Sequence, residues 1–485
     1  MNYKMMGRIT AFILLLEAAF MLPSILISLY CGDRTAAFSF ILSTLITAGA
    51  ALVLLWATRG ADMKFRARDG MVCVAVDWIV LSVFGALPFR ISGEIPRYID
   101  ALFEIVSGFT TTGASIVINV ETMSKGILYW RSFSHWVGGM GVLVFLLAIV
   151  PLSGRNNGFT LHLLRAESPG PNVGKIVPRM RQTAMILYVL YIMLTVTNVL
   201  FLLLGGMPFF DAVCTAYGTA GTGGFGVKAD SIAGYSPILQ TICTVFMLLF
   251  GVNFTIYHLL IRREYREIRK DEELWAYLGI AALATAVISW NVTPSFPSVR
   301  EAVHHAAFTV SSIMTTTGFC TVDYDKWPTL SKAIILTLMF VGASAGSTGG
   351  GFKVSRLLLT LKALRRNIHL ILHPNRVQKV RINGQPVPEK VMDNVDSYLS
   401  AYVLIVIVSF LLISTDRNFT VESNFSAVMC CFNNIGPGLQ QVGPSGNFSG
   451  YSDLAKLVLI MDMLLGRLEI FPILVLFSRT TWTRK

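Results

Sequence analysis

Four short segments along the chain combine glycine with threonine or asparagine in a similar way. They read Thr110-Thr-Thr-Gly-Ala114, Gly221-Thr-Gly-Gly-Phe225, Thr315-Thr-Thr-Gly-Phe319 and Asn433-Asn-Ile-Gly-Pro437. Glycine frees the backbone to turn its carbonyl groups toward one point, and rings of such neutral oxygens can replace the water shell of a monovalent cation. Calcium would favour carboxylates, which the segments lack. Their chemistry therefore suits a weakly hydrated cation such as potassium.

Each segment has one glycine at the corresponding position: Gly113, Gly224, Gly318 and Gly436. We expect these glycines and their neighbours to form the ion site, the neighbours being Thr110, Thr111, Thr112, Thr222, Gly223, Thr315, Thr316, Thr317, Asn434 and Ile435. Gly221 and Gly223 stand where the third segment carries threonine, so the second segment offers carbonyls there without hydroxyls. The alternative reading of each segment is a helix-breaking turn between packed helices. The recurrence of the pattern at four places argues against simple turns.

A short apolar stretch precedes each segment, and an apolar helix is expected on either side. The stretches are Phe103–Phe109, Phe209–Tyr217, Ala302–Ser312 and Phe425–Phe432. Helices of about ten residues are too short to cross a bilayer. Non-helical backbone survives at membrane depth only where protein buries it or a watery cavity adjoins it. The pattern predicts four re-entrant loops around one pore, with the negative ends of the short helices aimed at it.

The composition agrees with a membrane protein. Of 485 residues, 54% are hydrophobic and 14% charged, whereas soluble domains carry roughly 25% charged residues. Long apolar runs approach the length of a span, namely Ile9–Tyr30, Ala36–Ala57, Met185–Leu204, Ile238–Ile261, Leu454–Phe477 and Ala401–Ile413 with the preceding Val395–Ser400. The predicted fold class is an all-α integral membrane protein with four tandem helix–pore loop–helix repeats and an N-terminal two-helix hairpin.

These patterns divide the chain into consecutive units. The expected units are an N-terminal transmembrane hairpin (1–69), pore repeats at 70–152, 180–270, 272–370 and 392–482, and a polar cytoplasmic linker (371–390).

The formal net charge of +12 is explained by membrane topology. With a cytoplasmic start and about ten crossings, most Lys and Arg residues fall in cytoplasmic segments, as the positive-inside rule requires. Both termini are therefore predicted cytoplasmic, and nucleic-acid binding is not expected. The seven cysteines show no CxxC spacing and indicate packing residues.

A glycine-rich run, 341–353, interrupts the second helix expected in repeat three. It lacks the GxxxxGK[ST] phosphate-binding pattern, because Phe352 separates Gly351 from Lys353. We interpret it as a flexible hinge or plug in a pore-lining helix, whose key residues are Gly346, Gly349, Gly350, Gly351 and Lys353.

Several polar residues have two readings. Arg467 lies within the last apolar run, where a charge is costly and usually functional; it either lines the pore as a positive barrier or pairs with Asp462 or Glu469. Glu104 and Asp211 either attract cations or form ordinary polar pairs. The adjacent residues His304 and His305 favour capping or packing over metal binding.

The chain resembles the Trk/Ktr/HKT superfamily of potassium transporters over nearly its whole length. The resemblance is carried by the segments TTTGAS, GTGGFG, TTTGFCTVDYDKWP and NNIGPG, and by residues 130–141, 345–351 and 463–469. The N-terminal hairpin points to the TrkH-type branch, and Gly113, in place of the serine of many sodium-preferring members, favours potassium.

The resemblance implies potassium uptake across a bacterial inner membrane, with K⁺ as the transported ion and no other cofactor. It also implies a homodimer, a cytosolic nucleotide-binding regulatory ring of the TrkA-like kind, and gating by the loop 341–353 and Arg467. The alternative is an ion-coupled K⁺/Na⁺ or K⁺/H⁺ symporter. An enzyme is not expected, because no nucleophile–base pair or metal cluster is found in the spans.

Overall fold

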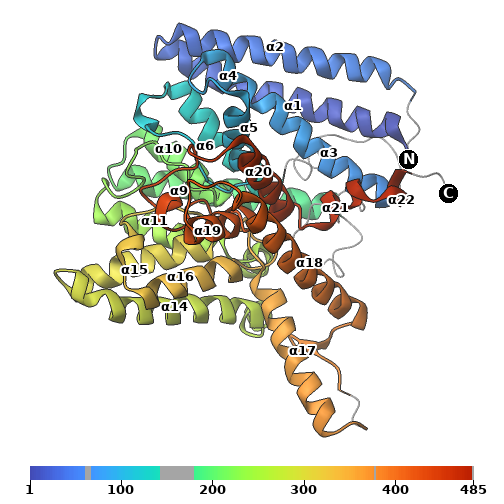
Figure 1. Cartoon of the computed structure of the whole chain (residues 1–485), viewed down its shortest axis with the longest axis vertical. Coiled ribbons are helices and arrows are strands. Elements are labelled where there is room, and N and C mark those ends of the chain that lie inside the picture. The colour runs from blue at the N-terminus through green and yellow to red at the C-terminus, as the bar shows by residue number, and fades with distance from the viewer. Residues whose placement is uncertain (61–66, 142–179, 376–377, 483–485) are drawn as a thin grey trace.

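The computed structural model describes residues 1–60, 67–141, 180–375 and 378–482 as a bundle of helices (Figure 1). The N-terminal hairpin consists of α1 (Tyr3–Tyr30) and α2 (Arg34–Ala57). Asp33 ends the turn between them, because its side chain accepts a hydrogen bond of 3.0 Å from the Ala36 amide and so caps α2.

Four units of similar layout follow the hairpin. The first contains α3 (Ala67–Gly85), α4 (Leu87–Ser92), α5 (Tyr98–Phe109) and α6 (Lys125–Gly139). The second contains α9 (Met180–Leu204), α10 (Phe209–Gly221), α11 (Pro237–Phe250) and α12 (Phe254–Ile261), and α13 (Tyr265–Arg269) leads to the third. The third contains α14 (Glu272–Val292), α15 (Val299–Met314), α16 (Thr329–Val341) and α17 (Val354–Leu372). The fourth contains α18 (Glu389–Ile413), α19 (Val421–Phe432), α20 (Asp453–Arg467) and α21 (Phe471–Phe477), and α22 (Arg479–Trp482) follows.

The four short helices before the glycine segments are α5, α10, α15 and α19. They hold 12, 13, 16 and 12 residues and begin up to five residues earlier than the apolar stretches suggested, except α10. Caps explain two of the earlier starts, since Ser298 and Thr420 accept hydrogen bonds from the amides of Glu301 and Ser423. At about 1.5 Å per residue each helix stays shorter than the roughly 30 Å hydrocarbon core.

Six helical stretches within the described residues are long and apolar enough to cross a membrane. They are Tyr3–Tyr30, Arg34–Ala57, Arg68–Ser92, Met185–Leu204, Glu272–Ser295 and Glu389–Ile413. The expected all-α layout of helix, short helix, break and helix is confirmed in the second, third and fourth units. Residues 142–152, which were expected to end the first unit, lie outside the described residues.

Two apolar runs predicted as single spans are broken, and that part of the prediction was wrong. The run 238–261 bends by 89° between α11 and α12, where the Asn253 side chain caps the second piece by accepting from the Thr255 amide. The run 454–477 breaks between α20 and α21, where Glu469 and Ile470 have φ of 56° and 66°. Each run is apolar on both sides of its break, which only Asn253 marks in the first run and Arg467 with Glu469 in the second, so the length of the runs did not reveal the breaks.

The expected interruption of the third unit is present, because α16 ends at Val341 and α17 begins at Val354. In Figure 1 the N-terminal hairpin lies at one end of the longest axis and α17 points away at the other.

The linker after α17 is not wholly irregular: β1 (Arg381–Ile382) and β2 (Gln385–Pro386) pair antiparallel, with Arg381 opposite Pro386.

Candidate ion-binding site

The four segments predicted to form an ion site meet in a closed ring. A Cβ added to Gly113 would run into the carbonyl oxygen of Gly223, and the same holds for Gly224 against Thr317 and for Gly318 against Ile435. The fourth glycine closes the circle, since a Cβ on Gly436 would lie 2.8 Å from the carbonyl oxygen of Thr112. Each glycine thus faces the residue that precedes the next glycine around the ring.

The backbone adopts the same unusual shape in all four segments. The glycines have φ of 79°, 75°, 80° and 99°. The residue two positions earlier is also left-handed, although it is never glycine: Thr111 (58°), Thr222 (55°), Thr316 (60°) and Asn434 (56°). Left-handed non-glycine residues cost roughly 1–3 kcal/mol each and cluster at functional sites. Four of them in register indicate that the ring geometry is imposed by the surrounding fold.

Each segment is anchored to its own short helix by one repeated hydrogen bond. The amide of the residue before the ring glycine donates to the carbonyl five residues earlier, at 2.8 Å in every case: Thr112 to Ser107, Gly223 to Gly218, Thr317 to Ser312 and Ile435 to Cys430. The ring therefore lies at the C-terminal ends of the four helices. Their negative dipole ends favour a cation there.

The threonine hydroxyls mostly brace the ring. Thr110 and Thr112 join through their hydroxyls at 2.8 Å, and Thr315 and Thr317 do the same at 2.8 Å. The Asn434 side chain donates to the Thr112 hydroxyl at 2.9 Å and so links the fourth segment to the first. All of these side chains are buried, which leaves backbone carbonyls as the main candidates for ion contact.

The second segment is braced by a residue that the sequence analysis did not single out. His135 of α6 is buried, and its Nδ1 lies 2.8 Å from the carbonyl oxygen of Gly108. The Phe225 amide donates to its Nε2 at 3.2 Å. A lone histidine in an apolar helix carries no sequence signal for such a role, because its partners are backbone groups from two different units.

Glu104 does not face the ion path. It is fully buried, and its carboxylate pairs with the Arg131 Nε at 2.6 Å and accepts from the Ile116 amide at 2.9 Å. The reading of Glu104 as an ordinary polar pair therefore holds. Asp211 likewise accepts from the Tyr235 hydroxyl at 2.8 Å.

The two adjacent histidines have separate polar partners. His304 Nε2 lies 2.8 Å from the Gln240 side-chain oxygen, and His305 Nδ1 lies 3.0 Å from the Thr321 hydroxyl. Within the part of the chain that the structure describes, no group of three metal-ligating side chains is found.

A cavity of about 170 Å³ adjoins the ring. All four ring glycines line it, and Ser115, Arg131 and Lys228 are among its polar residues. The cavity is therefore a candidate mouth, through which a hydrated ion would reach the carbonyls.

The loop predicted to gate the pore packs directly against the ring. The Gly350 amide donates to the Thr316 hydroxyl at 2.6 Å, and Lys353 donates to the carbonyl of Gly349 within the loop. Gly346 and Gly351 have φ of 71° and 79°, a conformation that favours glycine. The predicted gating residues are therefore together, at the break between α16 and α17.

Arg467 joins this loop to the first unit. Its guanidinium donates to the Thr348 carbonyl at 2.9 Å and to the carbonyls of Gly138 and Gly139 at 2.5 and 2.7 Å. Three carbonyls from two distant parts of the chain thus converge on one positive charge.

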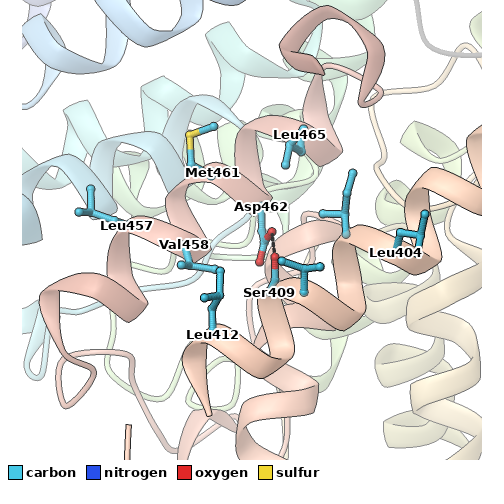
Figure 2. A pocket seen from close by; sticks show the side chains of 10 residues that line it. Leu404, Ser409, Leu412, Leu457, Val458, Met461, Asp462 and Leu465 are labelled. Atoms are coloured by element: carbon cyan, nitrogen blue, oxygen red, sulfur yellow. Dashed lines mark hydrogen bonds between the residues drawn. The ribbon is translucent and has the colours of Figure 1, made fainter. Parts of the chain in front are cut away.

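The two carboxylates considered as partners of Arg467 are bonded elsewhere. Glu469 pairs with Arg356 of α17. Asp462 accepts a hydrogen bond of 2.6 Å from Ser409, and Figure 2 shows the two side chains facing each other between α20 and α18, in a groove of about 420 Å³ lined by aliphatic side chains.

Comparisons with known proteins give consistent matches over the chain. A family profile described as TrkH, cation transport protein, matches residues 36–483. The Trk system potassium uptake protein TrkH of Salmonella typhimurium is 35% identical over 493 residues, with 99% of this chain and 100% of that protein covered. The Trk system potassium uptake protein TrkG of Escherichia coli is 32% identical over 491 residues, with 99% of each covered. The crystal structure of the potassium transporter TrkH from Vibrio parahaemolyticus matches with a TM-score of 0.89 at 33% identity, over 100% of both chains.

Proposed function

The chain belongs to the TrkH family of cation transport proteins, and on this premise we propose that it takes up potassium through the ring formed by its four glycine segments. It is a multi-pass protein of a bacterial membrane and a transporter, not an enzyme. The potassium assignment is supported by the names of its relatives, which are Trk system potassium uptake proteins.

One observation carries the selectivity proposal: the carbonyl before each ring glycine faces the preceding glycine of the ring, so that the four segments close on each other. Backbone carbonyls in a ring can replace the hydration shell of a potassium ion. No Asp or Glu lies within the four segments, so the site is neutral and suits a weakly hydrated monovalent cation.

The ion needs no chemical energy source to enter. A potential of 100 mV supplies about 2.3 kcal/mol per charge, which corresponds to roughly fifty-fold accumulation. Coupled symport with Na⁺ or H⁺ is the second candidate, but the segments offer no carboxylate for proton coupling. We therefore propose channel-like conduction.

Closure is proposed to depend on the loop 341–353 and Arg467, because the loop contacts the ring through Gly350 and Arg467 ties Thr348 to the first unit. By family membership we further propose a homodimer that docks on a cytosolic, nucleotide-binding, TrkA-like ring. Ligand binding to that ring would move the loop.

The test is ion flux into liposomes that contain the purified protein with its regulatory ring, with potassium compared with sodium. We expect potassium-preferring flux that loses its preference in Gly113→Ser, since a side chain there collides with the Gly223 carbonyl. Gly279→Ser is the matched control, because nothing lies within 4 Å of a Cβ at that position. Two results would refute the proposal. One is no flux of either ion when the regulatory ring is bound, and the other is the same preference for potassium in the wild type and in Gly113→Ser.

A further inference from the structure

The second segment of the ring, residues 221–225, lacks the threonines that brace the first and third segments. Gly221 and Gly223 occupy those positions, and the space beside them is taken by His135. A Cβ on Gly221 would collide with the His135 backbone carbonyl, and one on Gly223 would collide with its imidazole ring. Gly221 is therefore required by the backbone of α6, and Gly223 is required by the His135 side chain, which reaches over from the first unit.

His135 fixes two backbone groups on opposite sides of a unit boundary. Because the Phe225 amide donates to Nε2, that nitrogen carries a lone pair, and the proton of the neutral ring is on Nδ1. Nδ1–H then donates to the carbonyl of Gly108, near the C-terminal end of α5. One imidazole thus joins the short helix of the first unit to the residue that follows the ring glycine Gly224.

Arg131, one helical turn before His135 on α6, holds the same backbone from another side. Its guanidinium lies 3.9 Å from the centre of the Phe225 ring, and its Nη1 lies 3.4 Å from the Gly226 carbonyl oxygen. The buried pair with Glu104 at 2.6 Å keeps it in place. Phe225 and Gly226 are therefore held by two side chains of α6.

We propose that His135 is a positioning residue that determines ion selectivity. Its imidazole fills the space beside Gly223, where the third segment carries Thr317. It also fixes the Phe225 amide, so that the carbonyls of the second segment keep their spacing. Sodium is smaller than potassium and requires carbonyls to move inward, which a fixed segment resists. This inference rests on the proposed function of the ring as a potassium filter.

Three substitutions separate the two hydrogen bonds. His135→Ala removes both bonds, and it leaves space beside Gly223. His135→Asn places an amide donor near the former Nδ1 and keeps the bond to Gly108, whereas His135→Gln places an amide oxygen near the former Nε2 and keeps the acceptor for Phe225. In the liposome assay we expect the K⁺/Na⁺ flux ratio to fall about tenfold in the Asn variant, the effect of one lost buried hydrogen bond, and at least as far in the Ala variant, which loses both. The Gln variant should retain most of the ratio.

A rescue variant adds a second readout. In His135→Ala/Gly223→Thr, the threonine enters the space left by the imidazole and reproduces a residue of the third segment, so we expect part of the ratio to return. His304→Ala, which removes a histidine bonded to Gln240 and not to the ring, is the control and should keep the wild-type ratio.

The outcomes are distinct. A wild-type protein without potassium preference would overturn the proposed function and this inference together. A potassium-selective wild type whose His135 variants all keep the same ratio would overturn the inference alone. Equal loss of both fluxes, in variants that elute as the wild type does in size-exclusion chromatography, would mean a purely structural role and would also overturn it.

Discussion

The ring glycines differ in how tightly their neighbours enclose them. A Cβ on Gly224 would overlap the Thr317 carbonyl oxygen, whereas one on Gly436 would lie 2.8 Å from the Thr112 oxygen. We therefore expect Gly224→Ala to abolish potassium preference and Gly436→Ala to reduce it less, by roughly the few-fold that a small backbone shift costs. The two flux ratios, measured side by side, check this order. A greater loss in Gly436→Ala would mean that the enclosure of these glycines does not set selectivity.

Arg467 is the residue whose removal should open the pore. Without its guanidinium, the Thr348 carbonyl loses its tie to Gly138 and Gly139, and the positive charge proposed as a barrier is removed. We expect Arg467→Ala to raise potassium flux several-fold in the absence of the regulatory ring. Arg467→Lys keeps the positive charge, but its single ammonium group cannot donate to all three carbonyls as the planar guanidinium does. Its potassium flux should therefore lie between those of the wild type and Arg467→Ala. Unchanged or lower flux in the Ala variant would contradict a barrier role.

The glycines of the ring could be predicted from sequence, because a recurring glycine beside threonine has a direct backbone meaning. The left-handed threonines could not, since threonine rarely adopts that conformation and only tertiary contacts impose it. His135 was missed for a similar reason: its partners, Gly108 and Phe225, are far from it in sequence and offer only backbone atoms.

At the scale of helices, apolar runs predicted where helices lie but not where they break. Three of the helices that follow ring segments, α11, α16 and α20, end after 13 to 15 residues, and among these three breaks only the one after α16 is glycine-rich. The other two depend on single polar residues, Asn253 as a cap and Glu469 in a left-handed turn. These three helices that follow ring segments are therefore continued by separate helices beyond a break and not as single long ones.

One carboxylate of α14 ties the loop 341–353, which is proposed as the gate, to the first turn of α17. Glu273 Oε1 accepts from the Ala345 amide at 2.6 Å and from the Ser355 amide at 3.2 Å. Glu273→Ala removes both bonds, each worth about 1.5–3 kcal/mol when the acceptor is charged. The loop should then leave its present position more often, and potassium flux without the regulatory ring should rise.

Glu272 supplies the control for that measurement. It is adjacent in sequence but pairs with Lys362 and accepts from the Asn383 amide, at the linker hairpin and not at the loop. Glu272→Ala should therefore change basal flux much less than Glu273→Ala. Equal effects of the two variants would show that the end of α14, and not the loop contact, is responsible.

At the scale of the whole molecule, the arrangement of the ends limits the topology. The start of α1 and the helix α22 lie at the same edge in Figure 1, which agrees with an even number of crossings. The predicted orientation, with both ends cytoplasmic, rests on the distribution of Lys and Arg.

Cys31 offers a direct measurement of that orientation. It lies in the turn between α1 and α2 and is exposed, whereas Cys73, Cys214 and Cys243 are buried. If α1 begins in the cytoplasm, this turn lies on the opposite side of the inner membrane. A maleimide that cannot cross the inner membrane should then label the protein in intact cells whose outer membrane admits small reagents. Cys31→Ser should remove most of the label, since burial protects most of the other thiols. Labelling that appears only after the inner membrane is permeabilised would place the turn inside and reverse the proposed topology.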